Sequence, residues 1–332
     1  LTGGETGLYT YYRFNQALAN GSNMGLSTLL DATANGKNGT LTNFSLLNTS
    51  SNWISSEAPI STQNNALSFD GTNDYVSVPA LGSGLTQFTI ETWFNASNFI
   101  SAPFSGIFNT NGWSTGDVHF QITNTTIQLA VCGSTAANVN YSFSPNTWYH
   151  LAATYNSSTK KINVYVNGAL VQNVTLTTAF NANFNAAQIG AYTTSRYFAG
   201  KFDEYRIWNT ERTATDISTN MYKSYNGTES GLIAYFNFNE GNASGTNAGI
   251  TSLNNGIGTN HGTLTNFALS GTTSNWVTGI KDKPSSHVTN FNGSVVSTKM
   301  TLKWTDVING NSPDGYYIFA SKTNSFIDPT DG

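Results

Sequence analysis

Residues 200–217 read GKFDEYRIWNTERTATDI and contain the change of pattern that decides the fold. The first half alternates apolar and polar residues, as a half-buried β-strand does. Thr213 and Asp216 then have capping-box spacing, and the residues after them place Ile217 and Met221 on one face of a short helix. Because this helical pattern is the one convincing case in the chain, we expect one short helix among many strands.

The strand within this stretch carries two adjacent carboxylates, Asp203 and Glu204. Neighbouring side chains in a strand point to opposite faces, so we expect that these two cannot flank one scissile bond as a glycosidase pair does. Glu204 is expected to pair with Arg206, its neighbour two positions along on the same side.

The middle of the chain reads as short strands separated by turn residues. Asn167-Gly168, between NVYV and ALVQNV, is the signal for a two-residue hairpin. The other strand-like segments are 66–79, 87–96, 106–110, 116–123, 126–133, 147–156, 161–174 and 188–192. We therefore expect an all-β, two-sheet antiparallel sandwich with one helix.

The composition restricts the possible partners. Only 10% of the residues are charged, the net charge is −4, and the 14 basic residues are scattered, which argues against nucleic acid. A neutral surface rich in Thr and Asn suits an exported protein. The single cysteine, Cys132, excludes an intramolecular disulfide and is expected to be a buried strand residue. No apolar run reaches the length of a membrane span, so we expect no membrane insertion.

A sequence repeat brackets the predicted sandwich. Residues 7–55, from GLYTYYRF to SSNWIS, return as residues 231–279, from GLIAYFNF to SNWVTG. Residues 280–332 begin with a charged linker and continue as strand-like segments. We therefore assign residues 1–279 to the sandwich with both repeat copies, and residues 280–332 to a linker and the first strands of a second sandwich.

Several ordered motifs resemble the laminin-G-like, concanavalin-A-like jelly rolls of secreted bacterial proteins. They are FDGTNDYVSVP (69–79), FTIETWF (88–94), NTWYHLAATYN (146–156), INVYVNGALV (162–171) and the stretch quoted first. The resemblance covers roughly residues 7–226 and implies a jelly roll with sugar or protein recognition. It also implies that strands at 8–14 and 232–238 both join the jelly roll. Residues 284–332 resemble the first strands of a fibronectin type III module.

The resemblance further implies a bound Ca²⁺. The Asp of the last strand in related folds matches Asp203, and the match puts its partners near Asn15 and near Asp70 and Gly71. The alternative is that Asp203 accepts hydrogen bonds from a loop without any ion. Asp31, in LLDATANGKNGT, is a second candidate metal ligand, although Asx-turn chemistry alone could explain its loop.

Sugar binding needs an exposed aromatic ring surrounded by amide and hydroxyl groups. Trp93, Trp148 and Trp208 lie within the strand motifs, and Trp53 and Trp276 end the repeat copies, so we expect these five to be structural. Trp113 lies in the loop NTNGWSTGD, which has no apolar periodicity. We therefore predict a ligand-binding rim formed by Trp113 and by Tyr192, Arg196 and Tyr197.

Catalysis is not supported by the sequence. The laminarinase-type hydrolases of the same fold carry a Glu-x-Asp-x-x-Glu or Glu-x-Asp-x-Glu strand, whereas Glu91 stands alone in TIETWF. The four histidines form no metal or catalytic motif. We predict a non-catalytic, extracellular or cell-surface module that binds a polysaccharide or glycoprotein glycan for adhesion. A structural spacer that contacts only neighbouring domains or copies of the chain is the alternative, and a glycoside hydrolase is a third class.

Overall fold

The computed structural model describes residues 6–14, 16–17, 22–46, 53, 64–99, 104–280, 289–296 and 299–305. The chain divides into two units, Leu1–Ile280 and Lys281–Gly332. In the second unit the description is limited to an antiparallel hairpin of β21 (Thr289–Val296) and β22 (Lys299–Thr305). The fibronectin-like module predicted for residues 284–332 therefore stays a prediction, because most of it lies outside the described residues.

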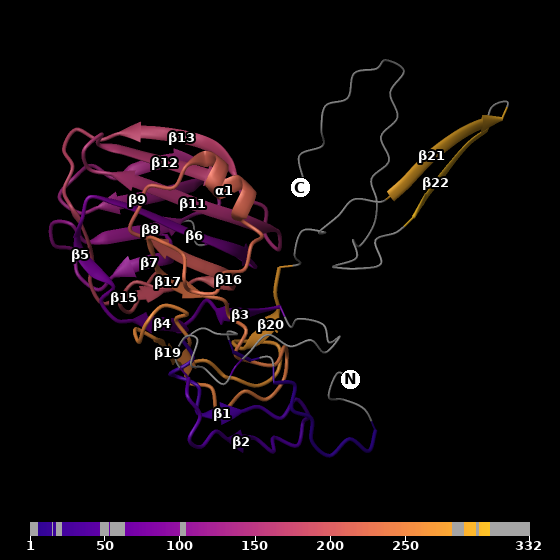
Figure 1. Ribbon diagram of the computed structural model, residues 1–332. Helices are drawn as coiled ribbons and strands as arrows, with labels where there is room; N and C mark the ends of the chain where they lie inside the picture. Colours follow the sequence, from indigo (N-terminus) through magenta and orange to yellow (C-terminus); the bar gives the residue numbers. More distant parts are fainter. Residues whose placement is uncertain are drawn as a thin grey trace. The chain divides into compact units, whose positions relative to one another are not determined.

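The first unit is a sandwich of two antiparallel sheets, which confirms the predicted fold class (Figure 1). The order of the first sheet is β13 (Ala169–Thr175), β12 (Lys161–Val166), β11 (Trp148–Asn156), β6 (Gln87–Ala96), β16 (Ala199–Trp208), β3 (Asn65–Asp70) and β20 (Trp276–Thr278). Beside β3, β17 (Leu232–Phe236) also pairs with β16.

The second sheet lies across the core from the first. Its order is β10 (Ala137–Asn140), β9 (Thr126–Val131), β8 (Val118–Ile122), β7 (Ser105–Thr110), β15 (Ala187–Ile189), β4 (Tyr75–Val78), β19 (Gly262–Thr265) and β18 (Ser252–Leu253). Two small pairs lie outside these sheets: β5 (Gly82–Leu85) with β14 (Ala182–Phe184), and β1 (Thr28–Leu29) with β2 (Gly39–Thr40).

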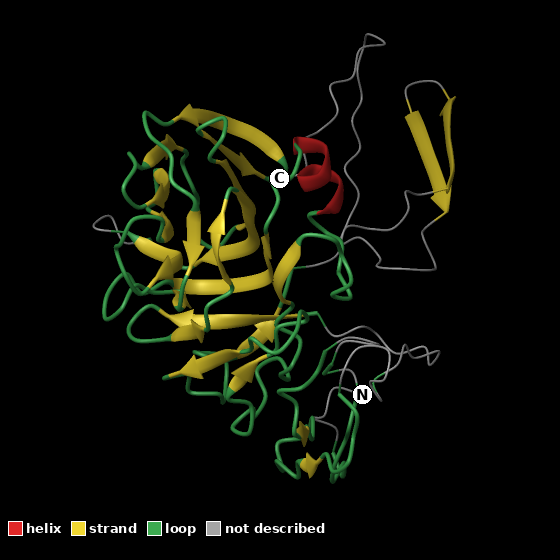
Figure 2. Cartoon of the chain, turned by 60° about the vertical axis from the view of Figure 1, so that its left-hand side comes forward, coloured by secondary structure: helices red, strands yellow, loops and turns green. Residues whose placement is uncertain are grey.

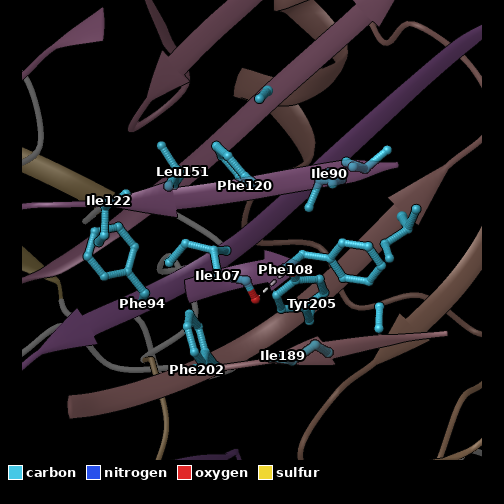
Figure 3. Packing of buried hydrophobic residues seen from close by; sticks show 14 of the residues in the cluster. Ile90, Phe94, Ile107, Phe108, Phe120, Ile122, Leu151, Ile189, Phe202 and Tyr205 are labelled. Carbon is cyan, nitrogen blue, oxygen red and sulfur yellow. Dashed lines mark hydrogen bonds between the residues drawn. The ribbon is translucent and has the colours of Figure 1, made fainter. Parts of the chain in front are cut away.

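The core fills the space between the sheets with aromatic and branched side chains (Figure 3). Phe202 and Tyr205 of β16 face Ile107 and Phe108 of β7, and the Tyr205 hydroxyl donates to the Ile107 carbonyl at 3.3 Å. That hydrogen bond satisfies the polar end of a fully buried tyrosine. These side chains join the two layers of the sandwich.

A β-bulge interrupts β16 at Glu204. The pairing with β6 shifts between Asp203 and Arg206, and Glu204 has a positive φ of 50°. Phe202 and Tyr205 consequently both belong to the core, although they are three residues apart. The strict alternation that we expected for Asp203 and Glu204 is therefore wrong here, because the bulge adds one residue to this strand.

The predicted helix is α1 (Ala214–Asn220), and its N-terminus has the predicted capping box. The backbone N–H of Asp216 donates to the Thr213 hydroxyl at 3.1 Å, and the N–H of Thr213 donates to the Asp216 carboxylate at 3.3 Å. Ile217 is buried against Ala152 and Tyr165, so α1 covers the outer face of the first sheet (Figure 2). It is far too short to cross a bilayer, and no other described segment forms a helix that could.

The two repeat copies differ in structure. The second supplies β17, β18, β19 and β20 to the sandwich, as the resemblance implied for residues 232–238. In the first, residues 8–14 form no strand, and Tyr12 makes an isolated bridge to Asp31. The prediction of a jelly-roll strand at 8–14 is wrong, because β3 and β17 already occupy the edge of β16 that β6 leaves free.

Local predictions within the sandwich hold where they depend on nearby residues. Asn167 and Gly168 both have positive φ, 50° and 77°, as the two-residue hairpin requires. Cys132 is buried as predicted, but it lies in the turn directly after β9 and not in a strand. Of the tryptophans expected to be structural, Trp148 is half-buried, and the others are buried: Trp53, Trp93, Trp208 and Trp276.

Candidate functional site

Trp113 lies on the loop between β7 and β8, with 53% of its surface exposed. Asp117 holds this loop in place, because its Oδ2 accepts the backbone N–H of Ser114 at 2.7 Å and its own N–H donates to the Ser114 carbonyl at 2.9 Å. The other carboxylate oxygen accepts the side-chain amide of Asn185 at 2.7 Å. A large aromatic ring is thus fixed at the surface by a buried acid.

The exposed indole ring rests on two other rings. The centroid of His119, from β8, lies 3.9 Å from that of Trp113, and the centroid of Tyr192 lies 6.0 Å from it. His119 and Tyr192 are in turn 5.0 Å apart. The Trp113 ring is therefore supported from below and is oriented before any ligand arrives.

Arg196 completes this group, which we call the Trp113 cluster (Trp113, His119, Tyr192 and Arg196). Its guanidinium carbon lies 4.8 Å from the Tyr192 ring centroid and 5.7 Å from that of Trp113. Such distances are those of cation–π contacts. Arg196 and Tyr192 lie close together because the backbones of Tyr192 and Ser195 bond to each other in a tight turn.

His119 stays neutral within the cluster. Burial lowers its pKa to about 4, and the charge of Arg196 acts in the same direction, although a hydrogen bond to the Gly112 carbonyl opposes them. Its Nε2 lies 2.9 Å from that carbonyl oxygen, and its Nδ1 lies 3.1 Å from Oδ1 of Asn109. His119 therefore acts as a buried support for Trp113 and carries no charge at neutral pH.

A row of amide side chains runs from the Trp113 cluster across the outer face of the second sheet. Arg196 donates to Gln121 on β8 at 2.7 Å, and Gln121 donates to Gln128 on β9. Gln128 then donates to Asn138 on β10 at 2.7 Å. We call Gln121, Gln128 and Asn138 the amide row. Their alignment follows from the pairing of Gln121 with Gln128 and of Gln128 with Asn138.

The structure brings together three of the four residues predicted for the binding rim. Trp113, Tyr192 and Arg196 share the cluster, whereas half-buried Tyr197 makes no ring or hydrogen-bonding contact with them among the described interactions. Sequence reasoning missed His119 and the amide row. The signal was present as polar residues alternating with core residues in VHFQI, TIQLAV and ANVN.

Asp203 is fully buried on β16 of the first sheet, next to the segment that follows β20. Its Oδ2 accepts the backbone N–H of Ile280 at 2.9 Å, while Oδ1 has no hydrogen-bond partner. Burial raises its pKa well above the usual range, and the neighbouring charge of Glu204 adds to the effect. The loop hydrogen bond is the one expected in the alternative without an ion.

The residues proposed as partners of Asp203 lie elsewhere. Antiparallel pairing of β16 with β3 sets Ala199 opposite Asp70 and Phe202 opposite Leu67. Continuing this register sets Asp203 opposite Ala66, four residues or about 13 Å along the strand from Asp70, and Gly71 lies further still. Asp70 instead closes its own turn by accepting the N–H of Thr72 at 2.7 Å. Asn15, the remaining predicted partner, lies outside the described residues.

Asp31 braces the loop that contains it. Its carboxylate accepts the backbone N–H groups of Tyr11, Thr33 and Lys37 at 2.8, 3.0 and 2.9 Å. Burial alone would raise its pKa, but these hydrogen bonds lower the pKa to about 2. The Asx-turn explanation accounts for this arrangement, and no cluster of three or more acidic, His or Cys residues suited to a metal occurs among the described residues.

The remaining acids of the first sheet are enclosed beneath α1. Glu91 accepts the indole N–H of Trp208 at 2.8 Å and lies 3.7 Å from Arg212. Glu204 lies 2.8 Å from Arg206 and accepts the hydroxyl of Tyr235, so the predicted pairing of Glu204 with Arg206 is confirmed. Neither carboxylate opens to solvent.

A hollow of about 280 Å³ lies at the turn between β8 and β9. The Phe99 ring stacks on Phe143 there, at 5.9 Å between centroids. Its lining consists of Ser97, Asn98, Phe99, Asn124, Phe143 and Pro145.

Comparison with known proteins supports the fold. Residues 70–218 match the family model described as the concanavalin A-like lectin/glucanases superfamily. No curated protein sequence matches the chain at a significant level. A candidate carbohydrate binding protein from Bacteroides ovatus ATCC 8483 superposes with a TM-score of 0.50 and 22% identity. That alignment covers 74% of this chain and 61% of the other, so this chain spans less than two thirds of that structure.

Two further solved structures are less similar. The native heptameric SAP-like pentraxin from Limulus polyphemus has a TM-score of 0.41 and 15% identity, over 48% of this chain and 83% of that one. A botulinum neurotoxin type C structure, described by its interaction with two ganglioside molecules, has a TM-score of 0.36 and 18% identity, over 44% and 37%.

Proposed function

We propose that this protein is a non-catalytic glycan-binding module whose binding surface is the Trp113 cluster with the amide row. One observation carries the proposal: an exposed indole ring, fixed on His119, stands at the end of a row of amide side chains. A pyranose ring can stack its C–H face on such a ring while its hydroxyl groups bond to the amides.

The lack of catalysis is part of the same proposal. Hydrolysis of a glycosidic bond requires two carboxyl groups facing the substrate. Among the described residues near the cluster, the acid is Asp117, and both its oxygens are engaged in holding the loop. A sugar on Trp113 would therefore be bound without being cleaved.

We also propose an extracellular or cell-surface location and a structural Ca²⁺ at Asp203. The fit rests on buried oxygen atoms without partners, Oδ1 of Asp203 and Oδ1 of Asn65. Both residues border Gly279, where an added Cβ would lie 2.3 Å from Asp203 Oδ2 and 2.8 Å from the Asn65 carbonyl oxygen. Calcium favours such carboxylate, amide and carbonyl oxygens, and would neutralise the buried charge.

A glycan array followed by calorimetry with Trp113→Ala tests the binding function. We expect affinity for the strongest array hit to fall about 10- to 100-fold, because a stacked aromatic contact is lost. Phe99→Ala is the matched control, since it removes an aromatic ring from the hollow at the β8–β9 turn. Unchanged affinity in Trp113→Ala would refute the proposal. A loss of affinity in Phe99→Ala alone would place the binding site at that hollow. A module that binds no glycan would act as a spacer.

A further inference from the structure

Arg196 carries a positive charge that no acid neutralises. No ion pair involving Arg196 occurs among the described residues. The nearby acid, Asp117, already binds Asn185 and the Ser114 backbone through its two oxygens. Of the guanidinium nitrogens, one donates to Gln121, and the others are neither paired nor enclosed. A half-buried cation with free N–H groups is therefore presented beside Trp113.

Arg196 also fixes the direction of the amide row. A guanidinium can only donate hydrogen bonds, so the Gln121 atom facing it must be the carbonyl oxygen. The Gln121 amide nitrogen must then face Gln128, and the Gln128 nitrogen faces Asn138. Each amide oxygen accepts a hydrogen bond within the row. Gln121 is buried, so the N–H groups left at the surface are one of half-buried Gln128 and both of exposed Asn138.

The outer surface is consequently rich in donors. From Arg196 to Asn138 the row crosses β8, β9 and β10, and from Gln121 to Asn138 it extends about 10 Å, two strand spacings. The hydroxyl groups of neutral sugars can accept hydrogen bonds from these donors, but they carry no charge to complement that of Arg196. Carboxylate and sulfate groups accept hydrogen bonds only, and their charge strengthens each one.

We infer that the ligand is an anionic glycan, with a carboxylate or sulfate held by Arg196 and the adjoining sugars lying along the amide row. This inference rests on the proposed function, because it assigns the chemical class of the sugar that stacks on Trp113. The planar guanidinium supplies a positive charge and can donate two parallel hydrogen bonds to the anionic group. The indole ring supplies the apolar contact.

The test compares matched pairs of probes by calorimetry on residues 1–332. An oligogalacturonide and its methyl ester share a backbone and differ in charge. A sulfated galactan oligosaccharide and its desulfated form test the sulfate in the same way. For at least one pair we expect the charged form to bind roughly 10- to 100-fold more tightly, as charged hydrogen bonds would give. The preference should weaken as salt concentration rises.

Variants then assign the preference to Arg196. Arg196→Gln should remove the difference within the pair, and Arg196→Lys should retain part of it, because lysine keeps the charge but loses the fork. Asn138→Asp should weaken only the charged probe. Lys161→Gln removes a charge from the exposed end of β12 and should change nothing. Circular dichroism of each variant verifies that it is folded.

The outcomes separate the two proposals. Equal affinity for the charged and uncharged forms of both pairs, with a loss in Trp113→Ala, would overturn the anionic ligand and leave glycan binding intact. A charge preference that Arg196→Gln leaves in place would also overturn it. If neither pair binds and array binding is insensitive to Trp113→Ala, both proposals fail.

Discussion

Glu204 Oε2 lies 2.8 Å from a terminal nitrogen of Arg206, across the bulge in β16. The same guanidinium donates to the carbonyl groups of Asn220, Met221 and Lys223, at 3.1, 3.3 and 2.6 Å. The last turn of α1 has no basic residue of its own. Arg206 therefore supplies, from the sheet, the donors that the C-terminal end of the helix lacks.

Arg206→Ala should destabilise the sandwich by about 3–5 kcal/mol, because it removes the ion-pair partner of the buried Glu204 carboxylate and the donors to several carbonyl groups. Urea unfolding measures the change. Lys161→Ala, which removes an exposed charge, should stay within about 0.5 kcal/mol of the parent protein. Equal midpoints for the two variants would show that Arg206 does not hold α1 on the sheet.

The capping box of α1 gives a second prediction. Thr213→Ala removes the hydroxyl that accepts the N–H of Asp216, and should cost about 1 kcal/mol. Thr219→Ala is the control, because exposed Thr219 bonds back to the Thr215 carbonyl and alanine is the better helix former. A Thr213→Ala variant as stable as Thr219→Ala would contradict a stabilising role for the cap.

These two features differ in how far the sequence predicts them. The cap depends on residues three positions apart, and the pattern Thr213 to Asp216 was sufficient. The bulge at Glu204 has no comparable sequence signal, because it is a mismatch between β16 and β6, which are far apart in the chain. The expected alternation of Asp203 and Glu204 failed for that reason.

The candidate sites show the same limit. Trp113 stood out because a loop offers no apolar pattern to explain a large ring, and Tyr192 and Arg196 lie in one short turn. The amide row depends on the register of three strands, which alternation alone does not determine. Register likewise separates Asp70 from Asp203, since β3 and β16 run antiparallel and place these acids at opposite ends.

Stability should fall as pH rises through the range where Glu240 ionises. Burial raises the pKa of this carboxyl from 4.5 to about 7, and one of its oxygens has no hydrogen-bond partner. A raised folded-state pKa means that the folded protein binds the proton more tightly than the unfolded chain. The stability that this proton contributes is fully present below about pH 4.5 and is lost as pH rises through about 7. The free energy of unfolding then falls by up to roughly 3 kcal/mol.

Glu240→Gln keeps the shape but cannot ionise, so its unfolding free energy should change less between pH 5 and about 8 than that of the parent protein. Urea titrations at matched pH values measure both. Burial also lowers the pKa of His261, and comparing the parent protein with the variant at each pH cancels the contribution of that residue. Parallel pH profiles would mean that Glu240 does not titrate as inferred.

The calcium proposal predicts a thermal shift that depends on Asp203. Binding to the folded state alone raises the unfolding midpoint as RT ln(1 + [L]/Kd), so millimolar Ca²⁺ should raise it above the value with chelator. Asp203→Asn, which keeps an oxygen acceptor for the Ile280 N–H but removes the charge, should abolish the shift. Asp31→Asn is the matched control and should keep it, because the Asp31 oxygens are bonded to their own loop. If the parent protein melts at one temperature with and without Ca²⁺, Asp203 is a hydrogen-bonding residue held protonated by its burial.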